Sequence, residues 1–407
     1  MLTFLLVVFW GSLFLLVYPY VIYPVLLKLF DAVFGENHNL KTLDDDWPSV
    51  SFMISAFNEA EHIAEKLQNA LELDYPADSL DIYVISDASD DGTDDIVREW
   101  ATRHPRIHLV RQNVRRGKAA GLNVAMGQVR SDLVVFSDAN AMFQPDAIKE
   151  LVKYFANPEV GYVIGSALYY ADDGNQAAGN EGVYWKFELF LKQVESRFYS
   201  VVGGDGAIYG IRRNLFWELA DDDINDFVNP LQIVAHGYRG IYNPDAICWE
   251  DAAGDFEKEF RRKRRIVNRS WRATRRYLHL FSPGRHAKFL FELFSHKVIR
   301  WFGFVFLSLA FLSNLGLLAA GASPFYALTM AGQVLMGVLS LIALNLQRRE
   351  RPIPTLVNLP YYFFLANYGA ILGIIDAFRG ETYTTWNHVR ISENVEEGQP
   401  SERRPSP

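Results

Sequence analysis

Three short segments in the middle of the chain carry the Asp, Asn, Glu and Ser side chains that commonly serve as ligands and catalytic groups. They are residues 55–59, 86–93 and 137–140, and each follows a short apolar run. Carboxylate and amide oxygens are ligands that suit hard divalent cations. The same residue types are favoured in turns and helix caps, so one such segment alone would predict little.

The elements around these segments predict that all three lie together. Short apolar runs typical of buried strands occur at residues 50–54, 82–85, 107–110 and 133–136. Helical spacing occurs at residues 59–73, at 118–128 and after Thr93. Alternating strands and helices imply right-handed crossovers and a mostly parallel sheet, with ligands outside the carboxyl ends of the strands. We therefore expect the polar segments at one edge of one sheet.

The order of these segments resembles the motif series of the family 2 glycosyltransferases. The matching stretches are residues 55–59, 86–93, 115–123 and 137–140. The resemblance extends from residue 50 to residue 276, and the apolar ends are similar to those of the membrane-bound, polysaccharide-synthase-like branch. It implies an α/β fold of the GT-A type, a Rossmann-like nucleotide-diphospho-sugar transferase domain with flanking transmembrane helices. It also implies an inverting transfer from a donor that is most simply UDP-linked.

Carried onto this chain, the family motifs imply a donor site. Asn58, Glu59 and Asp87 would hold the nucleoside, and Lys118 would meet the diphosphate as a point charge. The glycine-rich residues 203–212 resemble the stretch that lines the acceptor side, where Asp205 would bond an acceptor hydroxyl. A bulged or edge strand is the structural alternative for that stretch.

The resemblance also implies a divalent cation, Mg²⁺ or Mn²⁺. Asp138 and Asn140 match the Asp-x-Asp element that binds such a cation through oxygen ligands. The chain departs from the pattern at Asn140, whose amide is neutral. We therefore expect the cation to depend on Asp138 and on the donor diphosphate itself.

The transfer also requires a general base, because the neutral hydroxyl of the acceptor is a poor nucleophile. General base catalysis raises a reaction rate by about 10²–10⁴-fold. The family places this base in a Glu-Asp pair at the start of a helix, and the matching residues are Asn225 and Asp226. Asp226 keeps the carboxylate. A plain helix cap within the acidic run 221–223 is its structural alternative. The enzymatic interpretation predicts that Asp87, Asp138 and Asp226 surround one hollow.

The arginine-rich stretch at residues 260–276 has two interpretations. Processive family members carry a Gln-x-x-Arg-Trp element near this place, which aims Arg at the diphosphate. The match around Trp271 is incomplete, because no Gln is present. A basic helix on anionic lipid headgroups is the alternative, and both roles are compatible.

Apolar stretches at both ends predict membrane-spanning helices. From residue 2 to residue 30 the only charge is Lys28, and roughly 20 apolar residues suffice to cross a bilayer. Residues 301–347 contain no charge and are interrupted by turn residues at 321–324, which predicts two spans. Residues 352–375 are long enough for another, although Pro and Asn make them a poorer span. The flanking Lys and Arg residues favour a cytoplasmic middle region.

These patterns predict four parts of the chain. An N-terminal transmembrane helix at 1–30 precedes a cytosolic GT-A domain at 31–286. An interfacial helix with two to three transmembrane helices follows at 287–380, and a polar tail at 381–407. A cleaved signal peptide is the alternative for the first part. We expect a multi-pass protein of the cell (inner) membrane whose catalytic domain is cytoplasmic.

Composition excludes several classes of function. The 407 residues carry a formal net charge of -8, whereas nucleic-acid binders need a net basic footprint. The single cysteine, Cys248, allows no intramolecular disulfide and no cysteine-based metal cluster. A transporter would need charges within its spans, and these are nearly absent from residues 301–375.

The sequence therefore predicts a hexosyltransferase of polysaccharide or glycolipid biosynthesis. Its expected partners are a nucleotide-sugar donor, a polysaccharide or glycolipid acceptor and membrane lipids, without nucleic acid. The alternative is a non-catalytic, nucleotide-binding membrane subunit of a polysaccharide synthase complex, supported by the amides at Asn140 and Asn225. Processive or single transfer, and assembly with partner subunits, are left open.

Overall fold

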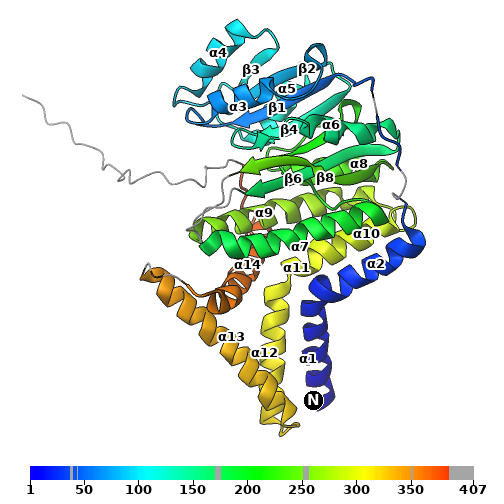
Figure 1. The fold of residues 1–407 in the computed structure, drawn as a ribbon. Helices are drawn as coiled ribbons and strands as arrows, with labels where there is room; N and C mark the ends of the chain where they lie inside the picture. The colour runs from blue at the N-terminus through cyan, green and yellow to red at the C-terminus, as the bar shows by residue number, and fades with distance from the viewer. Residues whose placement is uncertain are drawn as a thin grey trace, which may run out of the picture.

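The predicted alternation of strands and helices forms a mixed sheet above a layer of helices (Figure 1). The computed structural model describes residues 1–36, 40–43, 45–169, 176–250, 256–349, 351 and 353–384. Within these residues the sheet has eight strands in the order β3-β2-β1-β4-β7-β6-β8-β5. The strands are β1 (Val50–Ala56), β2 (Leu80–Ser86), β3 (Ile107–Arg111), β4 (Leu133–Asp138), β5 (Met142–Phe143), β6 (Val160–Tyr169), β7 (Tyr209–Arg212) and β8 (Arg239–Glu250).

The strand directions bring the three polar segments to one edge, as predicted. β1 pairs in parallel with both β2 and β4, and β7 is the antiparallel neighbour of β4. Ser55 pairs with Ile85 on one side and with Asp138 on the other. The polar segments therefore begin at neighbouring positions on the sheet, because parallel strands end on the same side.

Helices cover the sheet and connect its strands. In the sheet domain they are α3 (Ile63–Leu71), α4 (Thr93–Arg103), α5 (Lys118–Met126), α6 (Ala147–Val152) and α8 (Asn225–Ala235). Four 3-10 turns accompany them, at Ala77–Ser79, Lys153–Ala156, Arg213–Leu215 and Leu278–Leu280. Alternate strand residues belong to different hydrophobic clusters: Phe52 and Ile54 pack with one, and Met53 with another. The sheet thus has a buried apolar core on both faces.

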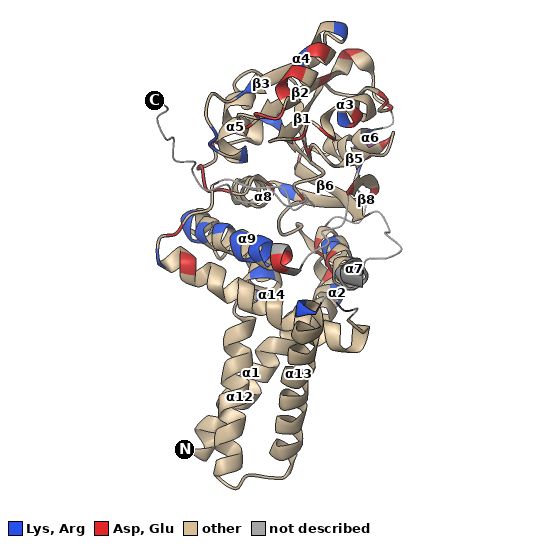
Figure 2. Ribbon diagram, turned by 90° about the vertical axis from the view of Figure 1, so that its left-hand side faces the viewer, with Lys and Arg blue, Asp and Glu red and all other residues tan. Residues whose placement is uncertain are grey.

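Below the sheet lies a layer of helices, and long apolar helices extend from it (Figure 1). The layer contains α7 (Gln176–Phe198), α9 (Phe256–Tyr277) and α10 (Ala287–Leu293). α10 continues through a π-helical turn (Phe294–Val298) into α11 (Ile299–Trp301). The remaining helices are α1 (Leu2–Val17), α2 (Tyr23–Phe34), α12 (Gly303–Ala319), α13 (Phe325–Arg348) and α14 (Thr355–Phe378). Figure 2 shows α1, α12 and α13 almost without charge and a row of Lys and Arg on α9.

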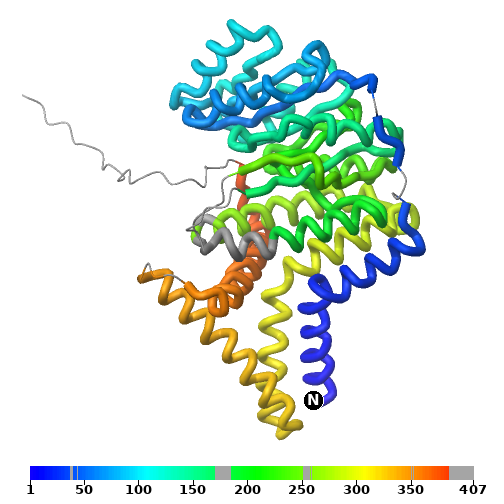
Figure 3. The backbone as a smooth tube through the Cα atoms, viewed as in Figure 1, coloured from blue at the N-terminus to red at the C-terminus, as the bar shows by residue number. Residues whose placement is uncertain are grey.

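Three helices in the described part of the chain are long and apolar enough to cross a membrane. They are Leu2–Phe34, Phe325–Arg348 and Thr355–Phe378; the bent pair Ala287–Trp301 and Gly303–Ala319 would make a fourth if it is one span. The tight turn predicted near residue 321 joins α12 to α13, with Gly321 at φ 71°. Figure 3 shows α1 and α12, which are distant in sequence, running side by side.

α14 differs from the other apolar helices because it packs against α9. Arg264 on α9 pairs with the buried Asp376 on α14, Nη2 to Oδ1 at 2.8 Å. A Cβ on Gly373 would lie only 2.4 Å from the Arg264 carbonyl oxygen, so glycine permits the close approach of the two helices. The predicted boundaries at residues 30, 286 and 380 stay predictions, and residues 385–407 lie outside the described part.

Candidate active site

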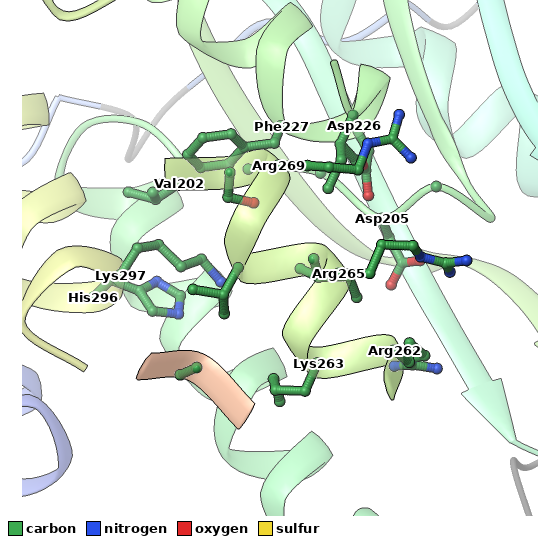
Figure 4. Close-up of a pocket in the computed structure, with 18 of the residues that line it drawn as sticks. Val202, Asp205, Asp226, Phe227, Arg262, Lys263, Arg265, Arg269, His296 and Lys297 are labelled. Atoms are coloured by element: carbon green, nitrogen blue, oxygen red, sulfur yellow. The ribbon is translucent and has the colours of Figure 1, made fainter. Parts of the chain in front are cut away.

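A cavity of about 430 Å³ lies between the sheet and the helical layer. Its lining comes from the end of β4, the loop at residues 202–207, the start of α8 and the end of β8. Residues of α7, α9, α11 and α14 complete it on the other side. Figure 4 shows side chains that contribute to this cavity from three places: Asp205 from the loop, Asp226 from α8, and Arg265 and Arg269 from α9.

Asp226 lies in the first turn of α8 and lines the cavity. The amide of Gly204 donates a hydrogen bond to its backbone carbonyl, which ties the glycine loop to the helix start. The side-chain Oδ1 is buried and accepts no hydrogen bond from any described residue. Burial raises the pKa of Asp226; the carboxylates of Asp205 and Asp138 act in the same direction, and Lys118 opposes them. A carboxylate with a raised pKa is a stronger general base than an exposed one.

Three charged groups surround a single position beside Gly206. A Cβ built on this glycine would lie 3.5 Å from Asp226 Oδ2, 3.7 Å from Asp138 Oδ2 and 3.7 Å from Lys118 Nζ. The predicted convergence is thus seen for Asp138 and Asp226, which stand 88 positions apart in the sequence. Because Gly206 has no side chain, this position is open to a ligand.

Lys118 and Asp205 both line the cavity, as expected for the predicted site. Lys118 begins α5, and its Nζ donates to Asp138 Oδ1 and, at 3.4 Å, to the Gly206 carbonyl. Asp205 Oδ2 accepts from Lys192 Nζ at 3.4 Å. Asp138 and Asp205 therefore each have a lysine neighbour. A phosphate that enters the cavity would contact these ammonium groups.

Asp87 lies beside the cavity and does not line it. Its Oδ1 accepts hydrogen bonds from the amides of Arg116 and Gly117, at 2.9 and 3.0 Å, and from Gln112 Nε2 at 2.7 Å. These bonds fix the loop that leads into Lys118. Burial raises the pKa of Asp87, and the two backbone amides oppose that effect. The structure thus connects Asp87 to the cavity through the loop, and its role towards a nucleoside stays a prediction.

Asn58 and Glu59 lie in the loop after β1, next to the loop after β2. Asn58, at φ 53°, donates from Nδ2 to Asp90 Oδ1 at 2.8 Å. The amide of Glu59 donates to Thr93 Oγ1 at 2.8 Å, and its side chain is buried. These contacts fasten two of the predicted polar segments to each other. They agree with a capping role and leave the nucleoside role untested.

The two Asn residues that replace family carboxylates, Asn140 and Asn225, are placed differently from Asp138 and Asp226. Asn140 is half-buried and is not among the cavity-lining residues. Asn225 lines the cavity, but its Nδ2 donates to the buried Tyr209 hydroxyl at 2.6 Å. Asn225 therefore anchors the first turn of α8 to β7, which holds Asp226 in place.

The donor set fits a cation that is shared with a diphosphate. Asp138 offers a hard carboxylate oxygen towards the cavity, and Mg²⁺ or Mn²⁺ is commonly held by one or two carboxylates together with substrate phosphates. Among the described residues no group of three or more His, Cys, Asp or Glu forms an all-protein metal cage. Asp138 is therefore the residue best placed to hold a cation here.

Glu250 is a cavity residue that the sequence argument missed. It is the last residue of β8, and its position after an apolar strand is the signal that identified the other polar segments. Burial raises its pKa to about 8, and the carboxylates of Asp205 and Asp138 add to this shift. At neutral pH a protonated carboxyl is thus available as a hydrogen-bond donor.

The arginines of α9 divide into two groups. Arg262, Arg265 and Arg269 line the cavity on one face of the helix. Arg272 and Arg276 bind the acidic loop before α8, each within 2.7 Å of an Asp222 carboxylate oxygen. Arg269 belongs to both groups, because its Nε also donates to the Asp222 carbonyl of this loop at 3.0 Å. The second group positions the start of α8 and hence Asp226.

Trp271, around which the Gln-x-x-Arg-Trp match is incomplete, is not among the cavity-lining residues. Its ring packs against Phe302 and Trp301, with centroids 5.5 and 6.3 Å away. It therefore joins α9 to the apolar helices.

Comparison with known proteins identifies the central region. A sequence profile described as Glycosyl transferase family 2 matches residues 51–220. The beta-monoglucosyldiacylglycerol synthase of Synechocystis sp. is 30% identical over 194 residues, which are 45% of this chain and 39% of that protein. The poly-beta-1,6-N-acetyl-D-glucosamine synthase of Staphylococcus epidermidis is 30% identical over 214 residues, 49% of each chain. The chain thus spans less than half the length of either relative.

A solved structure extends the similarity to nearly the whole chain. The mannosyltransferase PcManGT from Pyrobaculum calidifontis, in complex with GDP-Man and Mn²⁺, superimposes with a TM-score of 0.68 at 25% identity. The match covers 93% of this chain and 99% of that one. The predicted fold class, a GT-A-like α/β sheet with flanking apolar helices, is confirmed by it.

Proposed function

Because the chain contains a glycosyl transferase family 2 domain, we propose that it transfers a sugar from a nucleotide-diphospho-sugar to a glycolipid or polysaccharide acceptor at a membrane. One observation carries the proposal. Asp226, Asp138 and Lys118 surround one position beside Gly206, in a cavity large enough for a sugar. The names of the relatives, one a glycolipid synthase and one a polysaccharide synthase, support the acceptor classes.

The donor binds with its nucleoside near Asp87 and its diphosphate near Lys118. The loop that Asp87 holds leads directly into Lys118. The two residues are therefore close enough to bind the two ends of one nucleotide. The Lys118 ammonium and the Arg269 guanidinium act on the negative charge that develops as the diphosphate leaves. When bound at Asp138, a divalent cation supplies further stabilisation of that leaving group.

The acceptor hydroxyl attacks from the side of Asp226. Its proton passes to the Asp226 carboxylate as its oxygen bonds the anomeric carbon, and the bond to the diphosphate breaks in line. This displacement inverts the anomeric configuration. The buried Oδ1 of Asp226, which has no hydrogen-bond partner among the described residues, supports a reactive carboxylate more than a structural cap.

A panel of nucleotide sugars tests the proposal. The purified full chain is incubated with UDP- and GDP-linked sugars and a lipid extract, and nucleoside diphosphate release is measured together with product mass. We expect release and a glycosylated product with at least one donor. Donor binding without release or product would favour the non-catalytic, nucleotide-binding subunit.

Removal of the divalent cation is expected to lower turnover at least about tenfold, because only Lys118 and Arg269 then offset the charge of the leaving diphosphate beside the Asp138 carboxylate. Turnover is measured after EDTA treatment and again after addition of Mn²⁺ or Mg²⁺. Donor-induced thermal stabilisation is expected to fall in parallel. Turnover that is equal with and without EDTA would contradict a cation at Asp138.

We also place the sheet domain on the cytoplasmic side of the cell (inner) membrane. The support is the set of apolar helices at both ends and the Lys and Arg residues that flank them. The donor is thereby open to the cytoplasm, and the acceptor reaches the cavity from the bilayer.

A further inference from the structure

The wall of the cavity towards the apolar helices, which we call its membrane-side half, contains two π-helical turns. The turn Tyr18–Ile22 of the first apolar helix carries Tyr20, and the turn before α11 carries His296; both side chains line the cavity. The two turns touch, because the Tyr18 hydroxyl lies 2.8 Å from Ser295 Oγ. π-helical turns are rare and occur frequently at functional sites. This junction is therefore a place to look for a role besides membrane attachment.

A buried carboxylate, Glu195 on α7, lies at this junction. Its Oε1 accepts a hydrogen bond from the Tyr23 hydroxyl at 2.7 Å and lies 2.6 Å from His296 Nδ1. Tyr23 is the first residue of α2 and is fully buried. The other nitrogen of the His296 ring lies 3.0 Å from Glu188 Oε2, which fixes the orientation of the ring. Two segments that continue into apolar helices thus contact the same carboxylate.

The second oxygen of Glu195 holds the beginning of the glycine loop, residues 202–207. Glu195 Oε2 accepts a hydrogen bond from the Val202 amide at 3.2 Å. One turn earlier on α7, Lys192 Nζ donates to Asp205 Oδ2 at 3.4 Å. Figure 4 shows Val202 on the same side of the cavity as His296, and Asp205 on the opposite side. α7 therefore holds the loop at two separate points.

The position of the glycine loop determines the geometry of the candidate active site. The Gly204 amide donates to the Asp226 carbonyl, and the Gly206 carbonyl accepts from Lys118 Nζ at 3.4 Å. Gly203 adopts φ 81°, in the left-handed region. Glycines have the greatest conformational freedom of all residues, so they do not hold this path by themselves. The loop depends on its anchors, and Glu195 is the anchor at its beginning.

The cost of burying Glu195 supports a specific role. A buried carboxylate is unfavourable unless hydrogen bonds compensate for the lost water. Here the compensating donors are a hydroxyl from the first apolar helix and an amide from the glycine loop. The carboxylate is thus stable only while both segments are in place, and this links the position of one segment to that of the other.

We propose that Glu195 is a positioning residue for the transfer, and that it couples the first apolar helix to the glycine loop. Tyr23 and His296 hold the carboxylate, and the carboxylate holds the Val202 amide. Gly206 then stays beside the groups that surround the reacting sugar. The inference rests on the proposed glycosyl transfer, and it gives the first apolar helix a part in activity.

Two variants of the full chain in detergent test the coupling. Glu195→Gln keeps the size of the side chain, but its amide nitrogen cannot accept a hydrogen bond. We expect kcat to fall about 10²-fold, a loss comparable to misplacing a reactant by 1 Å. Tyr23→Phe removes one hydrogen bond to the carboxylate without a change of charge, and we expect kcat to fall about tenfold. KM for the donor is expected to change little, because Lys118 and the loop held by Asp87 are untouched.

Hydrogen exchange of the backbone amides provides a measurement that does not depend on turnover. We expect faster exchange in the peptide that contains residues 202–207 in both variants, and unchanged exchange in the rest of the sheet domain. Tyr326→Phe is the matched control. It removes another tyrosine hydroxyl from the apolar helices, one that accepts from Trp10 Nε1 at 3.3 Å and lies outside the cavity lining. Its kcat and its loop exchange are expected to equal those of the unmodified chain.

Each outcome decides one part of the inference. Unchanged kcat and loop exchange in Glu195→Gln would overturn the positioning role, and so would a loss of activity that a higher donor KM explains entirely. Unchanged values in Tyr23→Phe would overturn the coupling to the first apolar helix, and this variant decides alone if Glu195→Gln does not fold. Absence of turnover by the unmodified chain with every donor and acceptor would instead overturn the proposed function, whereas loop exchange would still show whether Glu195 holds the loop.

Discussion

Replacement of Asp226 by Asn is expected to lower kcat by about 10²–10⁴-fold, the usual contribution of general base catalysis. The amide keeps the size of the side chain, and the backbone bond from Gly204 is unaffected. It cannot accept the proton of the acceptor hydroxyl. Since Asp226 does not bind the donor in this mechanism, KM for the donor is expected to change little. Initial rates of nucleoside diphosphate release measure both values.

Asp245→Asn provides the matched control, because Asp245 is an exposed aspartate on β8 outside the cavity. Its kcat is expected to equal that of the unmodified chain. Equal sugar transfer by Asp226→Asn and the unmodified chain would show that Asp226 is not the general base. Glu250, the other carboxyl with a raised pKa in the cavity, would then be the next residue to replace.

The pH dependence of kcat is an independent test of Asp226 as the general base. Burial raises the pKa of Asp226 above its ordinary value of 3.8. A base works only when deprotonated, so activity rises with pH through this raised pKa and is lost below it. The acid limb of kcat is therefore expected above pH 3.8, and it is expected to disappear in the residual activity of Asp226→Asn.

The meeting of the polar segments at one edge of the sheet was predictable because local patterns determine it. Apolar runs predicted the strands β1, β2 and β4, and parallel pairing places their carboxyl ends on one side. The polar residues that follow had to meet there. Asp87 marks the limit of that reasoning. Its carboxylate binds the backbone of the loop before Lys118, and only the loop geometry shows that it stands beside the cavity.

The membrane-side half was not predictable from local patterns. His296 contacts Glu188, which is 108 positions away, and Tyr23 bonds Glu195 across 172 positions. The sequence predicted only an interfacial helix within residues 287–380, because charged residues beside an apolar stretch fit many folds. The arginines of α9 had two open interpretations for the same reason. Tertiary packing decides which of these arginines bind Asp222 and which line the cavity.

A methyl group at Gly206 is expected to lower kcat/KM by about 100-fold, a loss comparable to misplacing a reactant by 1 Å. In Gly206→Ala the new Cβ would lie 3.5 Å from Asp226 Oδ2 and 3.7 Å from both Asp138 Oδ2 and Lys118 Nζ. These are ordinary contact distances, so the protein itself can accept the methyl group. The substrate cannot, because the methyl group occupies the position that the three groups share.

The thermal midpoint of Gly206→Ala is therefore expected to stay close to that of the unmodified chain while activity is lost. Gly284→Ala is the control, because no atom lies within 4 Å of the Cβ it would add. Full activity of Gly206→Ala would mean that the sugar does not pass between Asp138 and Asp226. If both activity and donor-induced stabilisation are lost, the blocked position lies at the donor sugar or its diphosphate. If activity is lost and donor-induced stabilisation is kept, the blocked position lies on the acceptor side.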